Sequence, residues 1–305
     1  MTGSLLKFAE DYTAATDETE IIFGEPMREH TSFQIGGSAQ VFARVYSEEA
    51  LAIGLELCRR YGLPRYILGK GTNLLVSDKG LRGVVFDMTT LAGWKVEGTR
   101  LWAAAGTLLR QLGKAAAKAS LTGLEFAHGI PGTLGGALFM NAGAYGGEMK
   151  DITESVRIMG PEGRIRELDG AEMAFGYRSS RMEGSDEVIV SAVLRLEKGE
   201  AAAIEERMRE LSEKRREKQP LTYPSAGSTF KRPPGRFAGQ LIEEAGLKGF
   251  QIGGAQVSEK HAGFVINAGG ASARDVEALC REVIRRVEET SGVTLEREVR
   301  LWGEF

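Results

Sequence analysis

Two glycine-rich segments carry the residues with the clearest potential for ligand chemistry. The first, residues 69–73, follows the short apolar run 66–68, which predicts a strand, and the second spans residues 129–147. Glycines after a strand let the backbone approach a ligand closely, and successive amide N–H groups can then cradle a phosphate or pyrophosphate. Tight turns at a close strand crossing are the alternative, and the permissiveness of glycine favours that alternative for either segment alone.

Neither segment matches a standard nucleotide motif. Gly69-Lys70-Gly71 lacks the third glycine of the Rossmann fingerprint because residue 74 is leucine. No G-x-x-x-x-G-K-[ST] run is present, so a P-loop is excluded. An uncommon dinucleotide fold and a fold without a nucleotide both stay open on the residues alone.

A series of segments, in order from about residue 20 to residue 303, resembles the UDP-N-acetylenolpyruvoylglucosamine reductases. The segments that resemble the FAD-binding half of that family are Pro26-Met27 with residues 30–37 (HTSFQIGG), residues 67–75 (ILGKGTNLL), residues 129–136 (GIPGTLGG) and residues 140–146 (MNAGAYG). The segments that resemble its catalytic parts are residues 175–180 (FGYRSS), 225–233 (SAGSTFKRP) and 295–300 (LEREVR). Only residues 181–187 separate the first catalytic segment from the next strand, so the chain resembles the shorter subtype, which lacks a tyrosine-bearing insertion.

The resemblance implies an α+β fold: a FAD-binding domain of the vanillyl-alcohol-oxidase type with two subdomains, and a smaller α+β substrate-binding domain. We expect the first domain over residues 1–205, with its subdomain boundary near 90–100, and the second over residues 206–305. A charged helix over 200–218 followed by Pro220 and Pro224 favours a boundary in this region.

The resemblance also implies noncovalent FAD, NADPH as reductant, and UDP-N-acetylglucosamine enolpyruvate as the substrate that is reduced to UDP-N-acetylmuramate. The cofactor carries the hydride chemistry, while the protein supplies positioning and charge control. Hydride delivery to the double bond builds negative charge on the substrate carboxylate, and a well-placed donor there contributes about 3–4 kcal/mol.

By resemblance, Arg178 stabilises the enediolate, Ser228 donates the proton to the neighbouring carbon, and Glu298 assists. Taken singly, these residues are better explained as a solvated cation, a turn residue and an exposed carboxylate. A serine hydroxyl is also a weak acid, so its role requires tuning by neighbours. The matched segments are what favour the catalytic interpretation.

The resemblance places the flavin on the glycine-rich segments and the substrate beside the catalytic ones. The expected FAD-binding residues are Gly69, Lys70, Gly71, Thr72, Asn73, Leu74, Gly129, Ile130, Pro131, Gly132, Thr133, Gly136, Asn141, Ala142, Gly143 and Tyr145. The expected substrate-binding residues are Tyr177, Lys218, Lys231 and Arg232. Lys218, together with Lys231 or Arg232, would meet the diphosphate, and a solvated charge run is an equal alternative. His30 and His261 are expected to hold loops by hydrogen bonding.

Hydrophobic spacing predicts the elements that position these residues. The expected helices are 47–62 with Ser47 as N-cap, 107–120, 200–218, and one through 276–287 that ends at Gly292. The expected strands are 66–68, 84–86, 188–196 and 295–302, with Leu295, Val299 and Leu301 on one face of the last.

Composition limits the partners of this 305-residue chain. A net charge of -3 gives no broad positive field, so no nucleic acid is expected. Two cysteines and three histidines supply no metal-ligand cluster. No apolar run is long enough for a membrane span, and the acidic N-terminal region does not resemble a signal peptide. With Cys58 and Cys280 read as buried thiols, we expect a cytoplasmic monomer without membrane partners.

Two other functions compete with the reductase. An oxidase of alcohols or hydroxy acids with the same fold would keep the glycine segments, but it has no reason to carry the Arg178, Ser228 and Glu298 segments together. A nucleotide-binding module without turnover would lose nothing when Ser228 is replaced by alanine.

Overall fold

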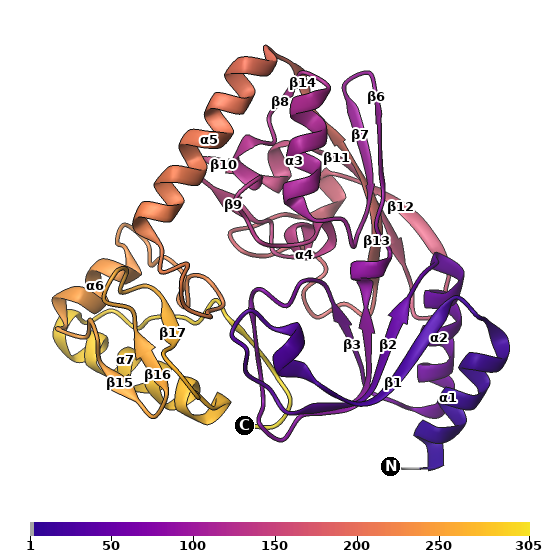
Figure 1. Cartoon of the computed structure of the whole chain (residues 1–305), viewed down its shortest axis with the longest axis horizontal. Helices are drawn as coiled ribbons and strands as arrows, with labels where there is room; N and C mark the ends of the chain where they lie inside the picture. Colours follow the sequence, from indigo (N-terminus) through magenta and orange to yellow (C-terminus); the bar gives the residue numbers. More distant parts are fainter. Residues whose placement is uncertain (1–2) are drawn as a thin grey trace. The chain divides into compact units, whose positions relative to one another are not determined.

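The computed structural model describes residues 3–305, which form two compact units (Figure 1). The first unit comprises the chain up to Phe23, Val41–Lys70 and Gly83–Lys214, and the second comprises Gly24–Gln40, Gly71–Arg82 and Arg215–Phe305. The division therefore falls within the helix α5 (Ala201–Lys218), beyond the expected position near 205, and two N-terminal segments group with the C-terminal residues. The assignment of a cofactor domain and a substrate domain stays a prediction.

A four-stranded sheet with strand order β1-β2-β5-β3 forms one part of the first unit. Its elements are α1 (Gly3–Ala15), β1 (Thr19–Pro26), β2 (Ser38–Val45), α2 (Glu48–Tyr61), β3 (Arg65–Leu68), β5 (Leu81–Asp87) and the 3-10 turn η2 (Met88–Thr90). The helices α1 and α2 lie side by side, and their buried side chains share one apolar core with the strands (Figure 1). Ser47 Oγ accepts a hydrogen bond from Ala50 N at 3.0 Å and caps α2, as predicted, and Gly62 ends it with φ +62°.

A five-stranded antiparallel sheet with order β12-β11-β13-β7-β6 forms the other part of the first unit. Its elements are β6 (Trp94–Glu97), β7 (Arg100–Ala104), α3 (Leu109–Lys118), α4 (Leu134–Phe139), β11 (Thr153–Met159), β12 (Ile165–Asp169) and β13 (Val188–Arg195). The buried faces of α3 and α4 pack against this sheet in a second apolar core. The chain passes from one sheet to the other between η2 and β6, and the expected subdomain boundary near 90–100 stays a prediction.

Short elements complete the first unit. They are β8 (Leu121–Thr122), which pairs with β14 (Glu197–Lys198), β9 (Gly143–Ala144), which pairs with β10 (Gly147–Glu148), and the 3-10 turns η3 (Glu125–Ala127), η4 (Met149–Asp151) and η5 (Ala171–Met173). Ile204 and Met208 of the charged helix α5 are buried against Ala117.

The second unit is built around a small antiparallel sheet and two helices. Its elements are η1 (Met27–His30), β4 (Leu74–Val76), α6 (Ala238–Glu244), β15 (Gln251–Ile252), β16 (Ala255–Val257), β17 (Val265–Asn267), α7 (Ala273–Ser291) and β18 (Arg300–Trp302). The predicted helix α7 is capped by Ser272, and Asp78 accepts hydrogen bonds from the backbone N–H groups of Ala273 and Arg274. This contact fixes the 71–82 segment to α7 within the unit.

One expectation from the sequence needs correction, and one helix was not expected. The strand expected over 295–302 is regular only at β18, because the N–H groups of both Glu298 and Val299 point to the single carbonyl of Thr229, at 2.9 and 3.5 Å, and this breaks the ladder register. The predicted apolar face holds, since Leu295 and Val299 are buried. The helix α1 was missed, although the spacing of its buried residues Leu5, Phe8, Ala9 and Tyr12 is helical. Between residues 3 and 305, no helix combines the length and apolarity that crossing a membrane requires.

Candidate active site

The two glycine-rich segments meet inside the first unit. Gly69 follows β3, and a Cβ atom there would lie only 2.4 Å from Thr133 Oγ1, so a side chain at this position would force the Thr133 hydroxyl to move. Thr133 is buried directly before α4 in the second segment. Two segments more than sixty residues apart thus lie close together in the first unit, where the backbone of both can contribute to one ligand site. The site fits a dinucleotide such as FAD.

Further expected cofactor residues lie in the loop from η3 to α4 and in α4 itself. Gly129, Ile130, Pro131 and Gly132 form this loop, in which Ile130 N donates to Ala127 O at 2.9 Å and Gly132 O accepts from Leu109 N at 3.0 Å. Gly136 lies within α4, and Ala142 N donates to Ala137 O at 2.8 Å just beyond it. These bonds fix the loop against α3 and α4.

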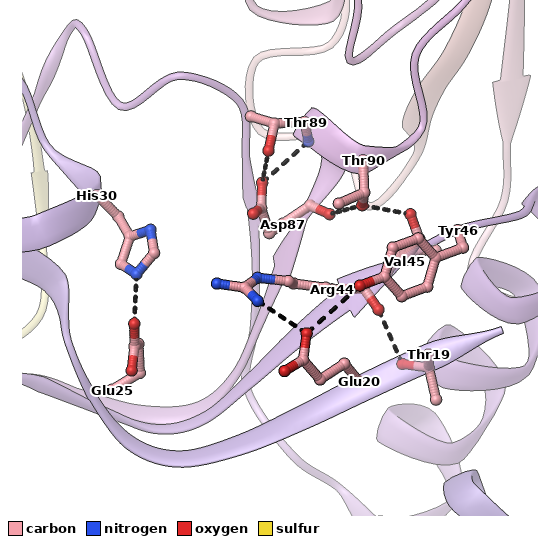
Figure 2. Close-up of polar contacts among 10 residues, drawn as sticks. All are labelled: Thr19, Glu20, Glu25, His30, Arg44, Val45, Tyr46, Asp87, Thr89 and Thr90. Atoms are coloured by element: carbon pink, nitrogen blue, oxygen red, sulfur yellow. Dashed lines mark hydrogen bonds and ion pairs between the residues drawn. The ribbon is translucent and has the colours of Figure 1, made fainter. Parts of the chain in front are cut away.

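Gly71 lies in the second unit, where it packs against the η1 turn. Its φ is +63°, and a Cβ atom would lie 2.0 Å from the carbonyl oxygen of His30. Ser32 N donates to Gly71 O at 3.0 Å. His30 Nε2 lies 2.7 Å from Glu25 Oε1, as Figure 2 shows, so His30 holds this turn by hydrogen bonding as expected.

Asn73 connects the first glycine-rich segment to the Glu298 segment. Its Nδ2 donates to Glu298 O at 3.1 Å, and its own carbonyl accepts from Arg300 N at 3.1 Å. Leu74, at the start of β4, then pairs in parallel with Arg300. A residue expected to bind cofactor and a segment expected to be catalytic therefore share one backbone network in the second unit. Thr72 lies between Gly71 and Asn73 in this network.

The Ser228 and Glu298 segments are paired in the second unit. The carbonyl of Thr229, next to Ser228, accepts from Glu298 N at 2.9 Å, and Lys231 N donates to Glu296 O at 2.8 Å. Ser228 is exposed and Glu298 is half-buried. The fold thus places a hydroxyl donor and a carboxylate on adjacent segments that are seventy residues apart in sequence.

Arg178 lies in the first unit, in a strained turn. Its φ is +54°, and Nη2 donates to Gly143 O at 3.0 Å. The guanidinium carbon lies 5.2 Å from the ring centroid of Tyr177, within cation–π distance. Tyr145 occupies the turn between β9 and β10 with φ +53° and is 45% exposed, as is suited to a surface that meets a ligand.

Two of the three expected substrate cations already have local partners. The Lys231 ammonium pairs with Glu296, and the Arg232 guanidinium lies 4.5 Å from the ring centroid of Phe237. Lys218 is exposed at the last residue of α5. These three residues belong to the second unit, whereas Tyr177 belongs to the first.

Sequence reasoning missed the charged partners around Asn141. Glu148 Oε2 accepts from Asn141 Nδ2 at 3.0 Å and lies 2.8 Å from Lys150 Nζ. The pKa of Glu148 is lowered, chiefly by the hydrogen bond from Lys150. The hydrogen bond from Asn141 and the charge of Arg178 act in the same direction, whereas burial opposes them. A short polar spacing such as 141, 148 and 150 carries no recognisable periodicity, so only the folded chain identifies this cluster.

His128, directly before the second glycine-rich segment, was also missed. Its Nδ1 is buried without a hydrogen-bond partner among the described residues. Burial, together with the charges of Arg110 and Lys114, lowers its pKa. His261 behaves as expected, because its Nδ1 accepts from Gly263 N at 3.1 Å and holds that loop.

Comparisons with known proteins agree with this arrangement. A family model described as "FAD binding domain" matches residues 39–169, and one described as "UDP-N-acetylenolpyruvoylglucosamine reductase, C-terminal domain" matches residues 219–302. The UDP-N-acetylenolpyruvoylglucosamine reductase of Caldanaerobacter subterraneus subsp. tengcongensis is 50% identical over 287 residues, 94% of this chain and 95% of that protein. The reductase of Clostridioides difficile is 50% identical over 286 residues, 93% and 94% of the two chains.

A solved structure extends the comparison to the fold. The UDP-N-acetylenolpyruvylglucosamine reductase of Thermus caldophilus superposes with a TM-score of 0.79 at 36% identity, covering 93% of this chain and 99% of that one. The expected α+β fold with a FAD-binding domain is thereby confirmed. The chain belongs to the family of UDP-N-acetylenolpyruvoylglucosamine reductases.

Proposed function

We propose that this chain reduces UDP-N-acetylglucosamine enolpyruvate to UDP-N-acetylmuramate, with noncovalently bound FAD and with NADPH as reductant, in peptidoglycan precursor synthesis. The observation that carries the proposal is the 50% identity, over 94% of the chain, to a reductase named for this substrate. When bound, FAD supplies the hydride transfer between NADPH and the carbon–carbon double bond. The contact of Gly69 with Thr133 and the loop before α4 supply the cradle that would hold it.

Arg178 is proposed to stabilise the charge that develops on the substrate. Reduction adds a hydride to the terminal carbon and a proton to the carbon that bears the carboxylate, and between these events negative charge spreads over the carboxylate. A guanidinium whose position is fixed before the reaction stabilises that charge without reorganisation. The bond to Gly143 and the contact with Tyr177 supply this fixed position.

Ser228 is proposed to donate the proton and Glu298 to assist it. The carbonyl of Thr229 accepts from the Glu298 N–H, which keeps these segments adjacent. A neighbouring carboxyl group is the kind of partner that a weakly acidic hydroxyl needs in order to act as a proton donor.

Lys218, Lys231 and Arg232 are proposed to bind the diphosphate of the substrate. Arg232 presents a planar donor fork that suits phosphate oxygens, whereas Lys231 would share its charge with Glu296. Tyr177 is proposed as a further substrate contact, since 48% of its surface is exposed beside Arg178.

We further propose that the protein acts as a monomer in the cytoplasm and serves cell-wall growth, cell shape and division. Burial raises the pKa of both Cys58 and Cys280 to about 12, so these thiols are held protonated and unreactive. Buried thiols of this kind are typical of a reducing compartment.

The decisive experiment follows the flavin absorbance. The purified protein is reduced anaerobically with one equivalent of NADPH, and UDP-N-acetylglucosamine enolpyruvate is then added. We expect bleaching and then prompt return of the yellow colour. Bleaching without return would retain a flavoprotein but reject this substrate, and rapid oxygen-dependent turnover of an alcohol would instead favour an oxidase. A colourless protein that cannot be reconstituted with FAD would contradict the proposal.

Replacing Ser228 by alanine separates turnover from binding. The variant is expected to retain FAD and NADPH-dependent bleaching while forming no UDP-N-acetylmuramate, because the proposed proton donor is gone. Unchanged product formation would remove Ser228 from the reaction.

A further inference from the structure

The turn that carries Arg178 is held by a buried residue from another segment. Gly176 N donates to Ser179 O at 3.0 Å, so Tyr177 and Arg178 form the two-residue connection between them. Arg178 has φ +54°, a conformation that non-glycine residues adopt only where surrounding structure enforces it. Gly176 O in turn accepts a hydrogen bond from Asn141 Nδ2 at 2.9 Å.

Asn141 uses its side-chain amide for three protein contacts. One N–H of Nδ2 goes to Gly176 O and the other to Glu148 Oε2 at 3.0 Å, while Oδ1 accepts from Lys150 N at 2.9 Å. An amide has two N–H donors, so both are committed. The side chain is fully buried, and its own φ is +42°. Asn141 therefore has no side-chain N–H left to donate to the flavin, which it was expected to contact.

The other end of Arg178 is fixed by the same hairpin. Its Nη2 donates to the carbonyl of Gly143 in β9, and Glu148 in the paired β10 carries the carboxylate that Asn141 holds. Gly143 and Glu148 are directly paired across this hairpin. Asn141 thus bonds to the backbone turn of Arg178 and to the strand opposite its guanidinium contact.

We propose that Asn141 is a positioning residue for Arg178: its amide joins the Gly176 carbonyl to the Glu148 carboxylate and thereby fixes both the turn and the hairpin that orient the guanidinium. The inference rests on the proposed function, in which this guanidinium meets the substrate carboxylate. Asn141 touches neither substrate nor cofactor through its N–H groups and acts through Arg178.

Asn141→Asp tests this role, because it keeps the shape and the acceptor for Lys150 N but turns both donors into acceptors that face Gly176 O and Glu148. We expect FAD content and the rate of flavin reduction by NADPH to stay within about twofold of the wild type. Reoxidation by UDP-N-acetylglucosamine enolpyruvate should slow by about 10- to 100-fold, the loss that a displacement of about an ångström causes. Equal losses in both half-reactions would overturn the proposal.

A double-mutant cycle with Arg178→Lys decides whether Asn141 acts through Arg178. If it does, the double variant reoxidises little more slowly than the slower single variant. The reason is that both substitutions disturb the same guanidinium, so their effects do not multiply. Multiplying effects would show that Asn141 acts independently and would overturn the inference. Asn141→Gly, which tolerates the positive φ while removing the amide, serves the same cycle if Asn141→Asp does not fold.

Asn267→Asp is the matched control. Asn267 is also buried, and its amide bonds to Phe33 O, Gly269 N and Ala271 N in the second unit, with no bond to the Arg178 turn. Asn267→Asp should lower thermal stability but should not selectively slow the reoxidation of the flavin by substrate. A selective slowing equal to that of Asn141→Asp would overturn the proposal. The wild type is measured first: if substrate fails to reoxidise it, the proposed function fails before any variant is compared.

Discussion

At the residue scale, the guanidinium of Arg178 has a geometry that lysine cannot reproduce. Its Nη2 bonds to Gly143 O while its plane lies near the ring of Tyr177. Lysine keeps the charge but replaces a planar fork by a flexible, strongly hydrated ammonium group. Arg178→Lys should therefore lower kcat for product formation by about 100-fold, the lower end of the range seen when one transition-state donor is removed, because the charge is kept. Stopped-flow absorbance measures the loss of turnover, and the FAD content of the purified variant shows whether the cofactor is retained.

Arg181→Lys provides the comparison at this scale. Arg181 lies three residues away and pairs with Glu187 at 3.7 Å, outside the proposed site. It should change neither FAD content nor kcat by more than about twofold, because a surface ion pair contributes little. If Arg178→Lys lost FAD and activity in parallel, Arg178 would be structural.

Sequence resemblance identified Arg178, but not its support from Asn141, since Glu148 and Gly176 are joined to Asn141 only by the fold.

At the element scale, α1 and α2 pack so closely that one glycine fixes their distance. A Cβ atom at Gly54 in α2 would lie 2.5 Å from Phe86 Cε1 and 2.9 Å from Tyr12 Cζ. Alanine normally favours a helix by about 1 kcal/mol over glycine. Here overpacking should reverse the sign, and Gly54→Ala should lower the free energy of unfolding by about 1–3 kcal/mol. Urea denaturation followed by circular dichroism measures it.

Gly3→Ala makes the same change at the first residue of α1, where no described atom lies within 4 Å of the added Cβ. It should be neutral or slightly stabilising, and an equal loss at both positions would contradict the packing argument.

The elements themselves differ in how well sequence predicts them. Local signals fixed α2, because Ser47 and Gly62 define its ends. The pairing of residues 296–299 with 229–231 depends on segments far apart, so alternation predicted its faces but not its hydrogen bonds.

At the scale of the whole molecule, the family was predicted from ordered motifs and is confirmed by relatives of about the same length. The grouping of residues 24–40 and 71–82 with the C-terminal residues was not predicted. Its cause is a set of long-range contacts: Asp78 caps α7, Asn73 bonds to the Glu298 segment, and Gly71 packs on the η1 turn. Composition and periodicity describe neighbours along the chain and carry no information about such contacts.

The stability of the whole molecule should depend on pH through two half-buried histidines. Burial lowers the pKa values of His128 and His261 below the ordinary 6.5. The unfolded chain therefore binds more protons than the folded chain between those lowered values and 6.5, so the free energy of unfolding falls as the pH falls through that window. Thermal denaturation between pH 7.5 and pH 5 should show this loss. His128→Leu should reduce the slope without abolishing it, because His261 remains, and a slope identical to that of the wild type would show that His128 titrates alike in both states.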